Sequence, residues 1–190
     1  QAPELDKLIK KIKNGFKPTF IARYNMTLWH LLRSLSKAGV KCSLNGSDQG
    51  ELDFLSDLHK LYIGEPVNNP DLKNTSYDRY FDNANLNDDR SAILACKFVQ
   101  SIGSNGVEFF NTMRDSLTVK SKADVLLTTV HQAKGLEFEH LFLMDDFPNC
   151  RNEKNSAFIP IEKEEAHLIY TAITRAKSSL SVPRSWSSER

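Results

Sequence analysis

The sequence lacks several features that would identify a function directly. It has only three cysteines, Cys42, Cys96 and Cys150, and no CxxC pair, which argues for a reducing compartment and against a disulfide framework or a zinc site. No apolar run approaches the length of a membrane span, and no signal peptide is visible. No G-x-x-x-x-G-K-[ST] sequence occurs, so the usual phosphate-binding loop for a nucleoside triphosphate is missing.

The chain also lacks a strong net charge. Its 25 lysines and arginines nearly balance 24 aspartates and glutamates, so no global basic field indicates nucleic acid, and any DNA contact would have to be local. A hydrophobic content of 40% with 11 phenylalanines is sufficient for a core, and 190 residues predict about one domain. The first residue is Gln1 rather than Met, which is consistent with a fragment of a longer protein.

The most informative stretch runs from Val125 to Asp146 and reads VLLTTVHQAKGLEFEHLFLMDD. Its two apolar runs, Val125–Val130 and Leu141–Met144, have the length of strands buried on both faces, as in a parallel α/β sheet. The polar turn between them holds a His, a Lys, a Gly and a Glu. Because sites in such sheets lie at the carboxyl ends of the strands, we expect a site where the first run ends.

Three segments resemble motifs of superfamily 1 DNA helicases of the UvrD/Rep/PcrA type. TVHQAKGLEF at residues 129–138 resembles motif V, T-x-H-x-x-K-G-L-E-[FW]; EEAHLIYTAITRAKSSL at 164–180 resembles motif VI; and FIARYN at 20–25 resembles motif IV. The three stand in the family's order, which makes the signal strong, whereas motif IV alone would be weak. The DDF at residues 145–147 looks most like the F-box DNA helicases within that group.

The motif VI segment departs from the family's pattern at two places. Ala166 and His167 stand where bacterial members often have two arginines, and Ser178 and Ser179 replace a usual basic pair. These changes weaken the expectation of a tight grip on phosphate or DNA, but they leave the TRAK core intact.

The resemblance implies an α/β fold, a RecA-like (P-loop NTPase-like) parallel sheet flanked by helices, with a short helical insertion. Residues 1–48 and 122–184 would form the RecA-like 2A lobe, and residues 49–121 would form a reduced helical 2B-like insertion. Residues 185–190 are predicted to be a disordered tail. The lobe that holds ATP and magnesium, called 1A, would lie outside this chain.

Periodicity and turn residues predict the individual elements. Helices are expected at 3–14, 28–38, 52–62, 90–102, 107–117 and from Glu164 onward; strands at 20–22, 40–44, 125–130, 141–144 and 179–182; and loops at 65–89 and 148–161. Asn25 or Thr27 is expected to cap the helix that follows the first strand.

The resemblance also implies roles for particular residues. Arg23 of motif IV and Arg175 of motif VI would stabilise charge on the γ-phosphate, for which the planar, permanently charged guanidinium is suited. Glu137 would accept a hydrogen bond from the ribose, and the further nucleotide-side residues are Lys134, Gly135 and Asn25. Thr129 and His131 would line the path of single-stranded DNA. No metal ligand is expected, because the family's metal-binding acids lie in the other lobe.

Each of these residues also has an ordinary structural interpretation. Arg23 could be a surface arginine at a strand end, and Arg175 could cap the carbonyls of its helix, which is compatible with the functional role. His131 alone would more often be a packed or solvent-facing histidine, and Glu137 could pair with Lys134. Only the three ordered motifs raise the functional interpretation above these.

The function implied is the C-terminal part of an ATP-dependent 3′–5′ DNA helicase, a hydrolase that is inactive without its other lobe. The cofactor would be Mg-ATP, with the magnesium held mainly by the 1A lobe. Partners would be single-stranded DNA, the 1A lobe and, if the parent carries an F-box, ubiquitin-ligase components; no membrane is expected. The location would be nuclear, or intracellular in a prokaryote, with a role in DNA repair and recombination. The alternative is a non-catalytic remnant that binds DNA or protein.

Overall fold

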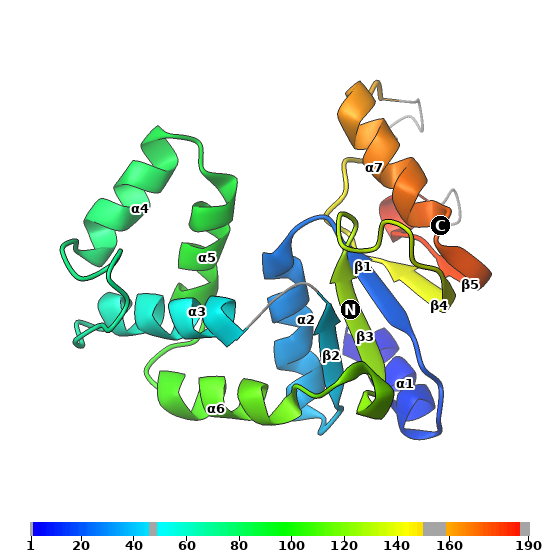
Figure 1. Ribbon diagram of the computed structural model, residues 1–190, viewed down its shortest axis with the longest axis horizontal. Helices are drawn as coiled ribbons and strands as arrows, with labels where there is room; N and C mark the ends of the chain where they lie inside the picture. The colour runs from blue at the N-terminus through cyan, green and yellow to red at the C-terminus, as the bar shows by residue number, and fades with distance from the viewer. Residues whose placement is uncertain (1, 46–48, 150–158, 187–190) are drawn as a thin grey trace. The chain divides into compact units, whose positions relative to one another are not determined.

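The computed structural model describes residues 2–45, 49–149 and 159–186. The chain divides into two compact units: unit 1 is Gln1–Gly46 with Leu117–Arg190, and unit 2 is Ser47–Ser116. Figure 1 labels the elements of both. None of the helices in these described ranges is long and apolar enough to cross a membrane.

Unit 1 is built on a sheet whose five described strands are all parallel. They are β1 (Thr19–Ala22), β2 (Cys42–Asn45), β3 (Val125–Thr129), β4 (Phe138–Leu143) and β5 (Ala176–Ser181), in the spatial order β2-β3-β1-β4-β5. β1 is central and pairs with β3 on one side and β4 on the other. The predicted α/β class with a parallel sheet is therefore confirmed, and the arrangement is consistent with a RecA-like lobe.

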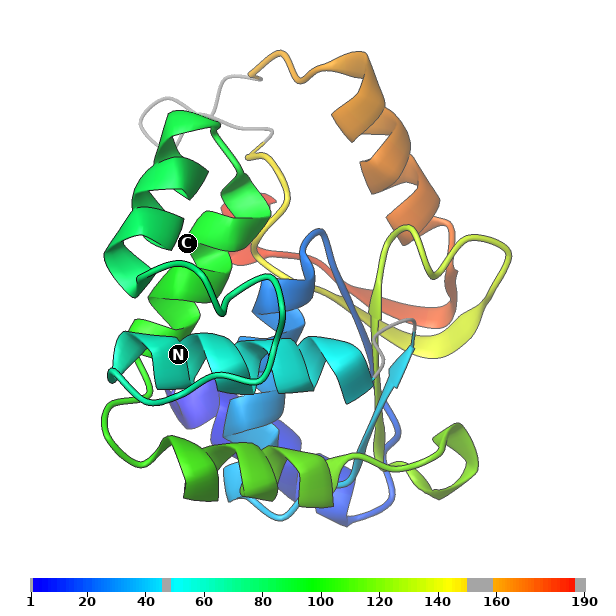
Figure 2. The ribbon, with the colours of Figure 1, turned by 60° about the vertical axis from the view of Figure 1, so that its left-hand side comes forward.

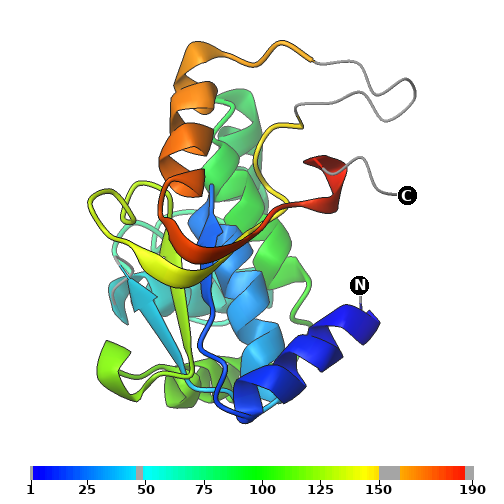
Figure 3. The same ribbon diagram turned by 90° about the vertical axis from the view of Figure 1, so that its right-hand side faces the viewer.

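Helices pack against this sheet. Unit 1 contains α1 (Ala2–Lys13), α2 (Asn25–Lys37), α7 (Lys163–Ile173) and the short 3-10 turns η1 (Lys120–Lys122) and η2 (Arg184–Trp186). α2 packs on β1, β2 and β3, and its Leu28, Leu32 and Leu35 are fully buried, as the i, i+4, i+7 spacing predicts. Figure 3 shows β4 and β5 as adjacent, strongly curved strands, of which β5 continues from the end of α7.

One face of the sheet forms an apolar cluster with α7. Ile21, Leu141 and Leu143 belong to this cluster, and α7 adds Ala172 with the partly buried Leu168 and Ile169. Successive side chains of a strand point to opposite faces, so Phe20 and Ala22, which are also buried, point to the other face. The central strand is thus covered on both sides.

Four local predictions need correction. β4 begins at Phe138 rather than Leu141, and β5 spans Ala176–Ser181 rather than 179–182, because the outer strands are partly exposed and mix polar with apolar residues. α2 has Tyr24 at its N-cap with no side-chain cap bond, so neither Asn25 nor Thr27 caps it. The prediction of a disordered tail is wrong for residues 185 and 186, because both belong to η2 and the Trp186 ring packs against Phe147. Residues 187–190, and 150–158 of the predicted loop, lie outside the described residues.

Unit 2 is helical. It contains α3 (Gln49–Tyr62), α4 (Tyr77–Leu86), α5 (Arg90–Gln100) and α6 (Gly106–Ser116). α5 packs against both α3 and α4, and α6 packs along α3, as Figures 1 and 2 both show. Its identity with a reduced 2B insertion stays a prediction.

The loop predicted at 65–89 is wrong for its second half, which forms α4. The helix begins after Ser76, whose side-chain oxygen accepts a hydrogen bond from the N–H of Arg79 at 3.3 Å. Tyr77 and Ala84, which are seven residues apart and so lie on the same face of the helix, are both buried. The Tyr77 hydroxyl donates to the carbonyl of Cys96. A short apolar stripe therefore outweighs the many Asn and Asp residues that suggested a loop.

The first half of that segment is held by a single carboxylate. Asp57 on α3 accepts hydrogen bonds from the N–H groups of Asn68 and Asn69, at 3.0 and 2.7 Å, and from the Lys60 ammonium at 2.7 Å. Burial raises the pKa of Asp57, but the bonds from Lys60, Asn69 and Asn68 outweigh it, so the pKa lies below its ordinary value. Beyond this anchor Leu72 is fully buried.

A buried histidine joins the end of α3 to the start of α6. His59 is 2% exposed, its Nε2 lies 2.7 Å from the carbonyl of Gly103, and its ring packs edge-on against Phe110. A Cβ on Gly106 would overlap the His59 ring. Gly106 is therefore required for space, because a larger residue would displace the histidine.

We expect Gly106→Ala to destabilise unit 2 by about 1–3 kcal/mol, because the cost of overpacking exceeds the gain that alanine usually brings to a helix. Amide hydrogen exchange over α3 and α6 measures the effect. In a His59→Ala background the cost of Gly106→Ala should fall, and Ser104→Ala serves as an exposed control. An equal cost in both backgrounds would contradict the explanation.

We expect Asp57→Asn to destabilise the segment around residues 63–72 by about 1–3 kcal/mol at pH 7, because the amide cannot replace all three bonds. The depressed folded-state pKa means that the carboxylate stabilises the fold above the pKa of an unfolded Asp, about 3.9, and that this contribution is lost as the pH falls through the folded-state pKa. The difference between the two proteins should therefore shrink below about pH 4.

Hydrogen exchange at pH 7 and in acid tests this prediction. The matched control is Asp53→Asn, because Asp53 also lies on α3 and pairs with Arg114, but its side chain is much more exposed than that of Asp57. We expect it to cost less than about 1 kcal/mol. A difference between wild type and Asp57→Asn that does not change with pH would refute the assigned role of the charge.

Candidate functional site

The parallel register places the ends of three strands at one edge of the sheet. Ala22 pairs with Thr129, and Ile21 pairs with Leu143, so the residues that follow β1, β3 and β4 emerge together. The N-terminus of α7 reaches the same edge, because a helix that connects parallel strands runs antiparallel to them. We call Arg23, His131, Asp146 and Glu165 the carboxyl-edge cluster.

Asp146 fixes the main chain at this edge. Its carboxylate accepts hydrogen bonds from the N–H of Arg23, at 3.0 Å to each oxygen, and from the N–H of Tyr24 at 3.0 Å. These are the two amides just before α2, and a negative charge there also complements the positive end of the helix. Asp146 thereby ties β1 to β4 and takes the place of the missing side-chain cap.

Arg23 connects the motif IV segment with those of motifs V and VI. Its Nε and Nη2 donate to Glu165, with Nη2 to Oε1 at 3.0 Å and Nε to Oε1 at 3.2 Å, and its Nη1 lies 3.4 Å from Nε2 of His131. The hydrogen bond with Glu165 raises the pKa of Arg23, although burial acts in the opposite direction. Arg23 therefore stays charged, and its side chain is 21% exposed.

The turn from 130 to 137 leaves this edge and leads to the start of β4, as the wide loop in Figure 2 shows. The N–H of Val130 donates to the carbonyl of Ala22 at 3.0 Å, which fixes the start of the turn. Lys134 is exposed, and Gly135 has φ +81°, a left-handed conformation that L side chains rarely adopt. Gly135 therefore shapes the turn through its backbone.

A second group lies where the turn ends, at the amino ends of β4 and β5. We call Leu136, Glu137, Arg175 and Lys177 the turn-end cluster. Arg175 donates to the carbonyls of Thr171 and Leu136, at 3.0 and 3.2 Å, and to the Thr174 hydroxyl, while its own carbonyl accepts from the N–H of Phe138. Arg175 thus closes α7 and holds the turn against it.

The predicted site residues fall into these two groups. Arg23 and His131 come together at the carboxyl edge, whereas Arg175 and Glu137 lie at the turn end; Glu137 is exposed and pairs with Lys177 at 3.2 Å rather than with Lys134. Thr129 is only 7% exposed, and Asn25 is an exposed residue in the first turn of α2. The structure therefore does not gather Arg23 and Arg175 into one cluster within this chain.

Sequence reasoning missed the two acidic residues that organise the carboxyl edge. Glu165 lay in the motif VI segment without a role of its own, and Asp146 served only as part of the DDF sequence. The signal for Glu165 was available, since an acidic residue in the first turn of a crossover helix lies at the edge where the motif IV arginine emerges. Within the described ranges no group of His, Cys, Asp and Glu side chains could hold a metal ion.

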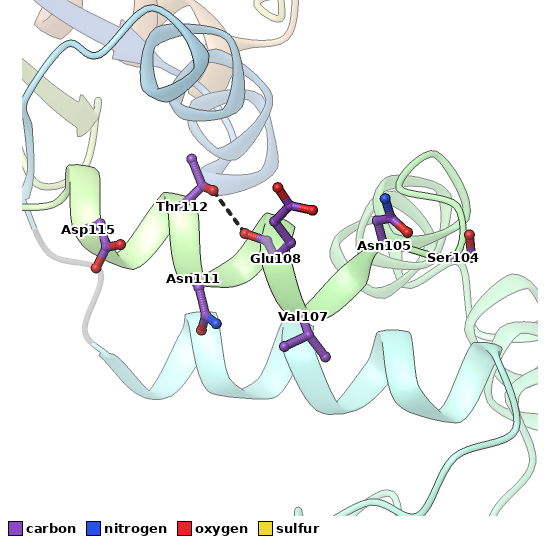
Figure 4. Close-up of a pocket in the computed structure, with 7 residues that line it drawn as sticks. All are labelled: Ser104, Asn105, Val107, Glu108, Asn111, Thr112 and Asp115. Atoms are coloured by element: carbon purple, nitrogen blue, oxygen red, sulfur yellow. Dashed lines mark hydrogen bonds between the residues drawn. The ribbon is translucent and has the colours of Figure 1, made fainter.

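Unit 2 carries a shallow hollow of its own. Figure 4 shows it along α6, where the Thr112 hydroxyl donates to the carbonyl of Glu108 at 2.9 Å. None of the predicted site residues lines it; its lining consists of Ser104, Asn105, Val107, Glu108, Asn111, Thr112 and Asp115. We assign it no role.

Unit 1 is a parallel α/β lobe, and comparison with known proteins shows what this chain is similar to. Residues 105–187 match the family described as UvrD-like helicase C-terminal domain. This match covers motifs V and VI, and confirms the resemblance seen in them; the motif IV segment lies outside it.

Two relatives carry helicase names. F-box DNA helicase 1 of Gallus gallus is 34% identical over 106 residues, which is 52% of this chain and 10% of that protein. A probable DNA helicase II homolog of Mycoplasma pneumoniae is 38% identical over 80 residues, which is 38% of this chain and 11% of that protein. The matches thus span about a tenth of the length of each relative.

We expect Asp146→Ala to destabilise unit 1 by about 1–3 kcal/mol, because two amides lose their acceptor. Urea unfolding followed by tryptophan fluorescence measures it, since both tryptophans, Trp29 and Trp186, belong to unit 1. Asp145→Ala is the matched control, because the side chain of Asp145 is exposed and accepts only from the Ser185 hydroxyl among the bonds described. Equal effects of the two substitutions would contradict the role of Asp146.

Proposed function

We propose that this chain is the C-terminal part of an ATP-dependent 3′–5′ DNA helicase, in which unit 1 is the 2A lobe and unit 2 a reduced 2B insertion. The observation that carries the proposal is the convergence of a motif IV arginine, a motif V histidine and a motif VI glutamate in one polar cluster. The family match over residues 105–187 and the helicase names of both relatives support it.

The exposed polar groups of unit 1 fit a nucleotide shared with a second lobe. Arg23 keeps N–H groups that Glu165 does not use, and the Glu137 carboxylate is exposed enough to accept a ribose hydroxyl. Arg175 donates to the carbonyl of Thr171 in its own helix and to that of Leu136 in the turn, so it would have to exchange at least one of these bonds to act as a second arginine finger. The phosphate cradle and the magnesium ligands would come from the 1A lobe, because this sequence has no Walker A segment.

Hydrolysis of bound ATP supplies the free energy, and the residues of this chain would position the nucleotide and bind its phosphate charge. Arg23 and Arg175 would stabilise negative charge on the terminal phosphate better in the transition state than in the ground state. Lys134 and Gly135 shape the turn beside Glu137, and Asn25 starts α2 next to Arg23. On the DNA side, His131 is exposed, whereas the burial of Thr129 limits it to a supporting role.

The proposed partners follow from the same assignment. They are single-stranded DNA and the 1A lobe, with ubiquitin-ligase components only if the parent protein carries an F-box. A nuclear location and a role in DNA repair or recombination are part of the proposal for a eukaryotic parent. The second candidate is a non-catalytic remnant that binds DNA or protein, which the engagement of Arg175 by its own helix favours.

Arginine-finger function is tested by ATPase assays, with and without single-stranded DNA, on the longer protein that contains this chain. We expect Arg175→Ala to lower kcat by at least about 100-fold while the protein remains folded, because the charge on the transferred phosphoryl group loses a partner. Arg175→Lys should rescue little, since an ammonium lacks the planar fork. Arg79→Ala, an exposed arginine of α4, is the control.

The isolated chain provides the second comparison. We expect it to show no ATPase activity above background, because the nucleotide cradle is missing. Turnover by the isolated chain, or full activity of Arg175→Ala in the longer protein, would refute the arginine-finger assignment and favour the non-catalytic alternative.

A further inference from the structure

The Arg23 guanidinium presents two edges that meet different neighbours. Glu165 occupies the side edge formed by Nε and Nη2, with distances of 3.0 to 3.3 Å. The end edge is formed by Nη1 and the second N–H of Nη2, and among the described residues only the long contact of 3.4 Å from Nη1 to His131 is made there. Glu165 therefore fixes the direction of the end edge without using it.

His131 can meet Nη1 in only one form. Guanidinium nitrogens are donors without acceptor capacity, so Nε2 of His131 must carry a free lone pair. The ring is then neutral with its proton on Nδ1. A guanidinium at this position thus selects one tautomer of an exposed histidine that begins the motif V turn.

We infer that Glu165 is a positioning residue for Arg23, and that the contact between Arg23 and His131 links the nucleotide side of this lobe to its DNA side. The inference rests on the proposed function, because it takes Arg23 as a phosphate contact and His131 as a DNA contact. It adds a residue, Glu165, and an atom-level route between the two ligands.

The route follows from the sharing of Nη1. A phosphate oxygen that approaches the end edge of Arg23 competes with His131 for this nitrogen, while the bonds to Glu165 can persist. His131 is then released, and its ring is free to turn toward a phosphate of the DNA backbone. Coupling of this kind is reciprocal, so DNA that engages His131 also frees the end edge of Arg23 for the nucleotide.

Nuclear magnetic resonance on the isotopically labelled 190-residue chain tests the geometry without ATP or DNA. We expect wild-type His131, assigned with a His131→Gln variant, to be mainly the Nδ1–H tautomer, and the Nε–H of Arg23 to exchange slowly with water. Glu165→Ala should speed that exchange about tenfold, because charge-assisted bonds are lost. It should also shift the His131 tautomer, although Glu165 contributes no bond to His131 in the contacts described.

Matched variants separate positioning from a general loss of structure. Glu164→Ala removes an exposed charge one residue away and should change neither signal. Glu165→Gln, which keeps one acceptor, should be intermediate, and Arg23→Ala should abolish the tautomer preference. If Glu165→Ala perturbs amide signals throughout unit 1, the protein has lost structure, and the tautomer of His131 in Glu165→Gln and Arg23→Ala is then the test. A His131 tautomer that does not respond to either of these two variants would overturn the inference.

A second assay distinguishes this inference from the proposed function. In the longer protein, Glu165→Ala should reduce the stimulation of ATPase by single-stranded DNA by at least about fivefold, the lower end of typical coupling between sites, while Glu164→Ala should not. Normal stimulation in Glu165→Ala would overturn the link between the two ligands even if the tautomer shifts. Absence of ATPase in the wild-type protein would refute the proposed function, whereas the positioning of Arg23 by Glu165 is judged on the resonance data alone.

Discussion

Parallel pairing of β1 with both β3 and β4 is the constraint on which the rest of unit 1 depends. The register aligns the three strand ends within about one residue, and it therefore places a motif IV arginine beside a motif V histidine that is more than 100 residues away in sequence. Backbone hydrogen bonds alone would not fix the chain where it leaves the sheet. Asp146 does so, because its carboxylate binds the first two amides beyond β1.

The two arginines of the site are held in different ways, and the difference matters for how each could act. Arg23 is paired through side chains, with a carboxylate on one edge and an imidazole on the other, so a single contact can be exchanged while the other persists. Arg175 is bonded largely to main-chain carbonyls of the helix it ends and of the turn beside it. Any movement of Arg175 toward a ligand would therefore disturb the junction of α7, the turn and β5.

Much of the fold was accessible from the sequence, for identifiable reasons. Buried strands such as β3 are continuous apolar runs, and α2 carries its leucines at helical spacing, so both were predicted. The errors fall where burial is partial. β4 and β5 mix polar and apolar residues at the less covered side of the sheet, and the short stripe of α4 is hidden among Asn and Asp residues.

The candidate site was predictable only as far as local sequence motifs reach. Motifs V and VI identified His131, Glu137 and Arg175, but not which of them meet, because contacts between Arg23, Glu165 and Asp146 join residues more than 120 positions apart. The same long-range geometry reassigned Glu137 from Lys134 to Lys177.

The bonds of the turn from 130 to 137 also restrict the number of residues that the turn can contain. The N–H of Val130 donates to the carbonyl of Ala22 at its start, and the Arg175 side chain donates to the carbonyl of Leu136 at its end. Between them, the N–H of Ala133 donates to the carbonyl of Thr129 and that of Leu136 to the carbonyl of Ala133. An inserted or deleted residue would break at least one of these bonds or shift β4 in register, which would turn Leu141 and Leu143 away from the core. The side chain of Gln132 is exposed and takes no part in these bonds, so a substitution there leaves them intact, whereas a change in the number of residues does not.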